Sequence, residues 1–107
     1  MKYLRKYKQM NEGKLIIEDE STFDQDIKWD MKIDISKIWK DFNEGILDIN
    51  SYNKQLAIKL EENLGDKKSQ FSNIIKELNN TNNQEDSISI WNKLYDVADK
   101  NLVEIKA

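Results

Sequence analysis

The stretch DIKWDMKIDIS, residues 26–36, decides how the N-terminal part of the chain folds, because apolar and charged residues alternate through it. The charged residues also alternate in sign, because aspartate and lysine follow each other at every second position from Asp26 to Asp34. A period of two predicts a β-strand with one apolar and one charged face. We therefore expect a strand at 27–33 that passes into a helix near Asp34 or Ser36. The alternative is a helix that begins already at Met31, because the apolar residues that follow it also fit helical spacing.

Downstream of this stretch, apolar residues recur every three or four positions, which predicts amphipathic helices. We expect helices at 35–44 and 49–64, a third that starts at Asp66, and a fourth after the loop at 79–84. Residues typical of helix ends separate them. The predicted caps and stops are Gly45, Asp48 or Asn50, Gly65, Thr81 or Asn82, and Asn101 in the left-handed conformation.

The fold predicted from these patterns is mainly α, a compact bundle of three to four helices. Three short runs are strand candidates, at 14–18, 27–33 and 102–106. If they form strands, they add a small two- or three-stranded sheet and the fold is α+β. At 107 residues we expect a single domain, 1–107. Its basic N-terminal segment, residues 1–12, is predicted to be a short helix or a loosely docked extension.

The composition excludes several kinds of catalytic site. The chain contains no cysteine and no histidine, so thiol nucleophiles, histidine bases and the common zinc ligands are absent. With three glycines and no proline, it has no glycine-rich phosphate-binding loop. We therefore predict no catalytic residue, no cofactor and no metal ligand.

Two alternatives give the charged residues a chemical role. Asp26-Ile-Lys28 and Asp30-Met-Lys32 match the (D/E)xK element of Mg²⁺-dependent nucleases, in which carboxylates bind the metal and the lysine positions water. The upstream acid would be Asp19, Glu20 or Asp24.

The second alternative is a helix–turn–helix nucleic-acid binder formed by 35–44 and 49–64. Its second helix would expose polar side chains able to contact bases and phosphates, namely Ser51, Asn53, Lys54, Gln55 and Lys59. The net charge of −3 argues against nucleic acid as the partner.

The leading functional prediction is non-enzymatic protein–protein interaction, with an unidentified protein or a second copy of the chain as partner. The tryptophans are expected in the core, and Trp29 is the one among them that would instead lie near an edge and anchor a partner. The other candidate contact residues are Lys28, Lys32, Tyr3 and Tyr7. The free edge of the strand at 27–33 is the predicted place of contact.

Two segments, MKYLRKY (1–7) and IWKDFNEGILDINSYNKQL (38–56), resemble small uncharacterised proteins of tailed phages that infect AT-rich hosts. The resemblance implies a phage product that modulates or inhibits a host or phage protein inside the host cell, and it carries over no catalytic residue. Because no apolar run is long enough to span a bilayer and no signal peptide is recognisable, we expect a cytoplasmic protein without membrane contact.

Overall fold

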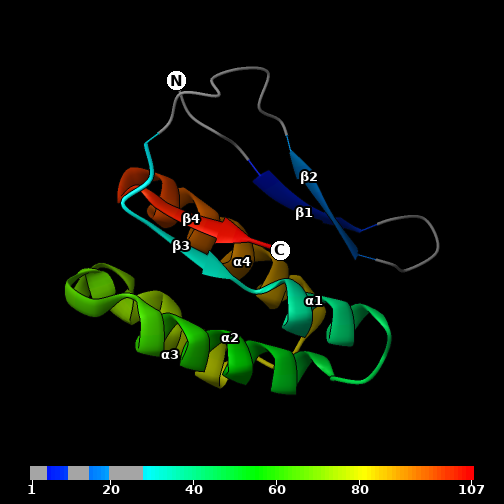
Figure 1. The fold of residues 1–107 in the computed structure, drawn as a ribbon. Helices are drawn as coiled ribbons and strands as arrows, with labels where there is room; N and C mark the ends of the chain where they lie inside the picture. Colours follow the sequence, from blue (N-terminus) through cyan, green and yellow to red (C-terminus); the bar gives the residue numbers. More distant parts are fainter. Residues whose placement is uncertain (1–4, 10–14, 20–27) are drawn as a thin grey trace.

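The computed structural model describes the backbone of residues 5–9 and 15–19 and all of residues 28–107 (Figure 1). The described part is mainly α with a small strand content, as predicted, but its strands form two separate sheets where a single sheet was expected. The elements in chain order are β1 (Arg5–Gln9), β2 (Leu15–Asp19), β3 (Met31–Asp34), α1 (Ser36–Asn43), α2 (Ile49–Asn63), the 3₁₀ helix η1 (Gly65–Phe71), α3 (Ser72–Asn80), α4 (Gln84–Lys100) and β4 (Val103–Lys106). Within these described ranges, no helix is both long and apolar enough to cross a bilayer.

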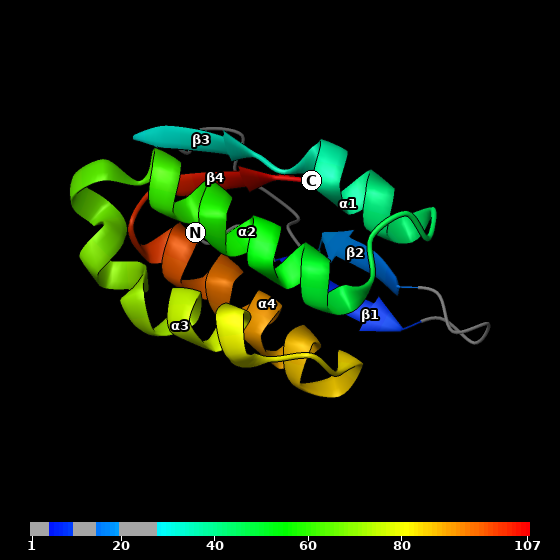
Figure 2. The same cartoon turned by 90° about the horizontal axis from the view of Figure 1, so that it is seen from below.

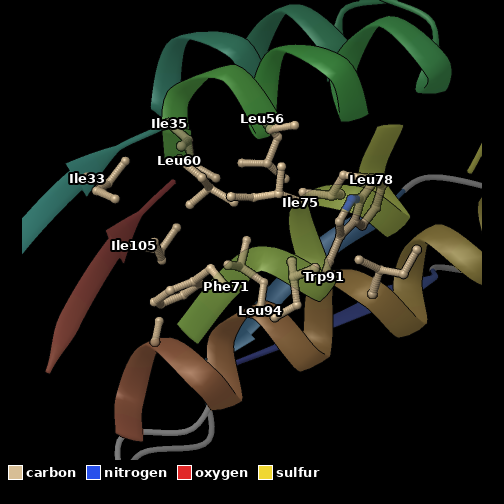
Figure 3. Close-up of a cluster of buried hydrophobic side chains, with 14 of the residues drawn as sticks. Ile33, Ile35, Leu56, Leu60, Phe71, Ile75, Leu78, Trp91, Leu94 and Ile105 are labelled. Atoms are coloured by element: carbon tan, nitrogen blue, oxygen red, sulfur yellow. The ribbon is translucent and has the colours of Figure 1, made fainter. Parts of the chain in front are cut away.

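The alternating stretch forms a strand, but a shorter one than predicted. β3 begins at Met31 and pairs in parallel with β4, which returns at the end of the chain after all four α-helices. Ile33 and its neighbour across the ladder, Ile105, point into the core (Figure 3), and both are buried. The predicted strand therefore exists, but residues 28–30 are not part of it and Ile27 lies outside the described residues. The alternative of a helix from Met31 is wrong.

The N-terminal helix is a wrong prediction, because Arg5–Gln9 is a strand. β1 pairs antiparallel with β2, with Tyr7 opposite Ile17. A helix this short is marginal in isolation, whereas the hairpin satisfies backbone groups of both segments in one ladder. The strand predicted at 14–18 thus exists as β2, but it belongs to a sheet separate from β3 and β4.

The helix ends follow local chemistry. α1 stops before Gly45, which has φ +80°, a conformation that residues with a side chain rarely adopt. Asp48 caps α2, as predicted, and its carboxylate accepts the Ser51 N–H over 2.7 Å. Asn83 caps α4 and the left-handed residue after α4 is Leu102, with φ 58°, each one residue from the prediction. The third helix was expected to start at Asp66, but that residue lies in η1 and α3 starts at Ser72.

The core lies between the β3–β4 sheet and the helices, and Figure 3 shows side chains from both converging on it. Four aromatic rings from three helices form one cluster in it: Trp39, Phe42, Tyr52 and Trp91. Their ring centroids lie 5.0 to 6.1 Å apart, mostly in tilted or edge-to-face arrangements. The cluster fixes α1 against α2 and α4, and α1 in turn fixes the end of β3.

Candidate partner-binding edge of the small parallel sheet

Among the described strands, β4 alone pairs with β3. The other side of β3 therefore has no described strand beside it. In Figure 2, β3 lies at the rim of the molecule, with β4 beside it. We call the outward-facing backbone of Met31–Asp34 the β3 edge.

Alternate residues of β3 direct their backbone N–H and C=O groups toward β4, and the residues between them direct these groups to the β3 edge. The Ile35 N–H donates to the Lys106 carbonyl, with 2.7 Å between nitrogen and oxygen, so Ile35 faces β4. Because successive residues of a strand direct their backbone groups to opposite edges, Ile33 also faces β4. Lys32 and Asp34 therefore present their N–H and C=O groups outward.

The outer face of the sheet is charged, and the charges of β3 lie opposite unlike charges of β4. Lys32 lies opposite Glu104, and Asp34 lies opposite Lys106, so each cross-strand pair joins unlike charges. Glu104 is half-buried and the other three side chains are exposed. Parallel strands are usually covered on both faces, so a solvated charged face on this pair is unusual.

Asp34 also holds the junction between β3 and α1. Its carboxylate accepts hydrogen bonds from the hydroxyl and the backbone N–H of Ser36. These two bonds lower the pKa of Asp34 below its ordinary value of 3.8, and the bond from the Ser36 hydroxyl has the larger effect. Its side chain is therefore a fixed negative charge beside the β3 edge at neutral pH.

The start of β3 is held to the turn after α4. The Asp30 N–H donates to the Leu102 carbonyl over 2.7 Å. Lys67 of η1 bridges the same two segments, with its Nζ 3.0 Å from Asp30 Oδ2 and 2.8 Å from the Asn101 carbonyl oxygen. This bridge leaves residues 28–30 outside the ladder and ends the β3 edge at Met31.

The predicted contact residues take different places. Lys32 is exposed on β3, and Lys28 is exposed just before the strand. Trp29 is half-buried beside them, so it neither joins the core fully nor projects freely. Tyr7 contributes backbone to β1, its side chain lies outside the described residues, and so does Tyr3.

The residues of the nuclease alternative do not converge where they are described. Asp30 is paired with Lys67, and Lys32 lies opposite Glu104. Asp24 and Asp26 lie outside the described residues. Within residues 28–107, no three acidic, histidine or cysteine side chains are grouped so that they could hold a metal ion.

The helix–turn–helix alternative contains one wrong assignment. α1 and α2 form the predicted helical pair, but Asn53 is not available to a nucleic acid because it is completely buried. Its amide donates to Ser87 Oγ and to the Thr81 carbonyl, and its oxygen accepts the Trp91 indole N–H over 2.8 Å. Asn53 is thus a structural residue that joins α2 to α4.

An open groove of about 630 Å³ lies between α3 and α4. Lys93 and Glu77 meet across it with 3.5 Å between Nζ and Oε1, and most of the side chains lining it are polar or charged. Small-molecule sites are lined mainly by apolar and aromatic groups, so this groove is a weaker candidate than the β3 edge.

Three residues of the charged face were not among the predicted contact residues, namely Asp34, Glu104 and Lys106. The sequence does contain a sign of this pairing. MKID (31–34) and VEIK (103–106) carry charges at the same spacing in opposite order, so that in register each charge faces an unlike one. Comparison of the chain with protein-family models, with curated proteins and with solved structures found no match in any of the three.

Proposed function

We propose that this chain is a non-enzymatic protein-interaction domain that takes up an extended protein segment along the β3 edge. The observation that carries the proposal is the phase of β3, which turns the backbone groups of Lys32 and Asp34 outward with no described strand to receive them. Addition of a strand to such an edge is a recurrent mode of peptide recognition, in which main-chain hydrogen bonds supply affinity.

The surroundings of the β3 edge favour a protein over a nucleic acid. Positive and negative side chains alternate along β3 and are balanced by those of β4. A phosphate backbone is bound by a surplus of lysine and arginine, which this face lacks. Trp29, half-buried at the start of β3, adds an aromatic group of the kind enriched at protein interfaces.

The biological setting that we propose rests on the resemblance to small tailed-phage proteins. In that setting the domain acts in the cytoplasm of the host cell and modulates or inhibits a host or phage protein. A catalytic role is not part of the proposal.

A proline substitution tests the role of the β3 edge. Lys32→Pro removes an outward N–H while leaving the Ile33 and Ile35 bonds to β4 in place, and proline is tolerated at strand edges. Lys32→Ala is the matched control, since it removes the same side chain and keeps the N–H.

The assay is capture of partners by each tagged variant from cells of the source organism or host, followed by reconstitution with the purified partner. We expect a partner that binds wild type and Lys32→Ala and is lost with Lys32→Pro, while circular dichroism shows all three folded. Equal binding by Lys32→Pro would remove the β3 edge from the proposal. A duplex DNA that shifts at low salt would favour the nucleic-acid alternative instead.

A further inference from the structure

The charge pattern of β3 is complementary to itself when the strand is turned end to end. Lys32 and Asp34 lie on either side of Ile33 and point to the same face of the sheet. A two-fold axis through Ile33 therefore places Lys32 of one copy opposite Asp34 of the other, twice. Building on the proposed function, we infer that the segment bound at the β3 edge is β3 of a second copy of this chain, antiparallel and centred on Ile33.

The backbone phase fits this register. In an antiparallel pair, opposite residues alternate between those that exchange both hydrogen bonds and those that exchange none. Lys32 and Asp34 present their N–H and C=O groups to the β3 edge, while Ile33 is turned to β4. Lys32 opposite Asp34 is thus the bonded pair, and Ile33 opposite Ile33 is the non-bonded pair at the axis.

The outer face of the combined sheet has unlike charges at every neighbouring position. Across the four strands, one row reads Glu104, Lys32, then Asp34 and Lys106 of the second copy. The two-fold axis generates the second row, with the same residues in reverse. Each charge then has an unlike charge on every flanking strand, an arrangement that cross-strand pairs favour.

Other registers are less favourable. An axis through Lys32 or Asp34 places like charges opposite each other. An axis through Met31 keeps unlike charges opposed but needs residues 28–30 as strand. Those residues are held outside the ladder by the Asp30–Leu102 hydrogen bond and the Lys67 bridge. The register centred on Ile33 is the one that the described contacts favour.

The contact in this register is small, because the paired strands are only four residues long. Interfaces below about 1,200 Å² are typical of weak and reversible association, so dimerisation should depend strongly on concentration.

Charge reversal tests the pairing across the axis. Lys32→Glu places the new acid opposite Asp34 at both symmetry-related positions, and Asp34→Lys places the new lysine opposite Lys32 at both. Each variant alone should therefore dimerise about tenfold or more weakly than wild type. An equimolar mixture of the two should recover the wild-type association, because every reversed side chain then meets an unlike charge. Lys106→Glu is the matched control. It makes a comparable like-charge pair between β3 and β4 but lies away from the axis, and it should associate like wild type.

Disulfide trapping tests the register in this cysteine-free chain. Opposite residues of a bonded antiparallel pair have Cα atoms about 5.5 Å apart, within disulfide range. Mixed Lys32→Cys and Asp34→Cys chains should therefore oxidise to a crosslinked heterodimer. Neither variant should crosslink to itself, because diagonal neighbours lie about 7–8 Å apart.

Sedimentation velocity over a concentration series measures the association, with circular dichroism as the folding check. Recovery of the dimer in the charge-reversed mixture, together with crosslinking only between unlike variants, would support the inference. Self-crosslinking of either variant would overturn the register. A wild-type monomer at about 1 mM, far above the working range of micromolar complexes, would overturn the second copy as occupant. If that monomer still binds a partner that Lys32→Pro loses, the proposed function stands without the homodimer. If it binds none, both fail.

Discussion

Replacing Asn53 with alanine should remove a large part of the stability of the folded chain. The Asn53 amide is completely buried in α2 and contacts three groups from other segments. These are the Trp91 indole N–H at 2.8 Å, the Ser87 hydroxyl at 2.7 Å and the Thr81 carbonyl at 3.1 Å. Asn53→Ala deletes all three bonds and leaves their partners in place.

The magnitude follows from how many of those partners stay buried. Trp91 and Ser87 are completely buried, and each polar group left without a partner costs about 1–3 kcal/mol. Thr81 is half-buried, so its carbonyl can regain water at a smaller cost. We expect a total loss of about 3–5 kcal/mol, against a typical domain stability of about 5–15 kcal/mol.

Urea unfolding followed by far-ultraviolet circular dichroism gives the free energy of unfolding. Asn63→Ala is the matched control on the same helix, because the Asn63 side chain is exposed and, among the described residues, donates to the Lys59 carbonyl in the preceding turn. It should change the stability by less than about 0.5 kcal/mol.

A double-mutant cycle with Trp91→Phe isolates the indole contact. Phenylalanine has no N–H to leave unpaired, so Asn53→Ala should cost about 1–2 kcal/mol less in that background. A cost of Asn53→Ala below about 1 kcal/mol, or a coupling indistinguishable from zero, would refute the role assigned to this network.

Three further predictions concern the ends of elements. Lys67→Met removes the bridge from Asp30 to Asn101 and should lower the free energy of unfolding by about 0.5–1 kcal/mol, with faster hydrogen exchange at the Asp30 amide. As a control, Lys100→Met removes the exposed pair with Asp96 and should leave exchange at the Asp30 amide unchanged. Leu102→Gly should raise the stability by about 1 kcal/mol in urea unfolding, because φ 58° suits glycine, and a lower midpoint would show that the half-exposed leucine contributes more by packing. Asp48→Asn should lower Tm at pH 7 but not at low pH. The hydrogen bond from the Ser51 N–H holds the pKa of Asp48 in the folded chain below its ordinary value of 3.8. The charge of Asp48 therefore contributes stability above the ordinary pKa, and this stability is lost as the pH falls through the pKa of the folded chain. An unchanged Tm difference between pH 7 and pH 2 would contradict that assignment.

The sequence predicted β3 and the helices because each is determined by the spacing of its own residues. The alternation around Ile33 and the helical spacing of the later apolar residues need no distant partner to be recognised. The start of β3 was predicted too early for the opposite reason. The pattern continues back to Ile27, but the ladder stops where Asp30 bonds Leu102 and Lys67, which lie far away in the sequence.

Asn53 shows the same limit within a helix. Its side chain is polar, so it was assigned to the exposed face of α2 that a helix–turn–helix would present. It nevertheless shares a helical stripe with Ala57, Leu60 and Leu64, all of which are buried. That spacing was a usable sign of burial. The groups that satisfy the amide, Ser87 and Trp91, belong to α4 and cannot be read from the spacing within α2.

The charges beside the β3 edge limit which strands can add to it. An apolar edge accepts almost any extended segment and promotes aggregation, whereas charged side chains on an edge strand oppose unselective pairing. Lys32 and Asp34 already have unlike neighbours on β4, so an added strand that brings like charges is repelled on both rows. In the proposed mode of binding, an added strand is favoured when its charges alternate in the complementary order, and β3 itself meets that condition when reversed. Because these side chains are exposed, the selectivity should weaken as salt screens them, and the gap between wild type and Lys32→Glu in dimerisation should narrow at high ionic strength.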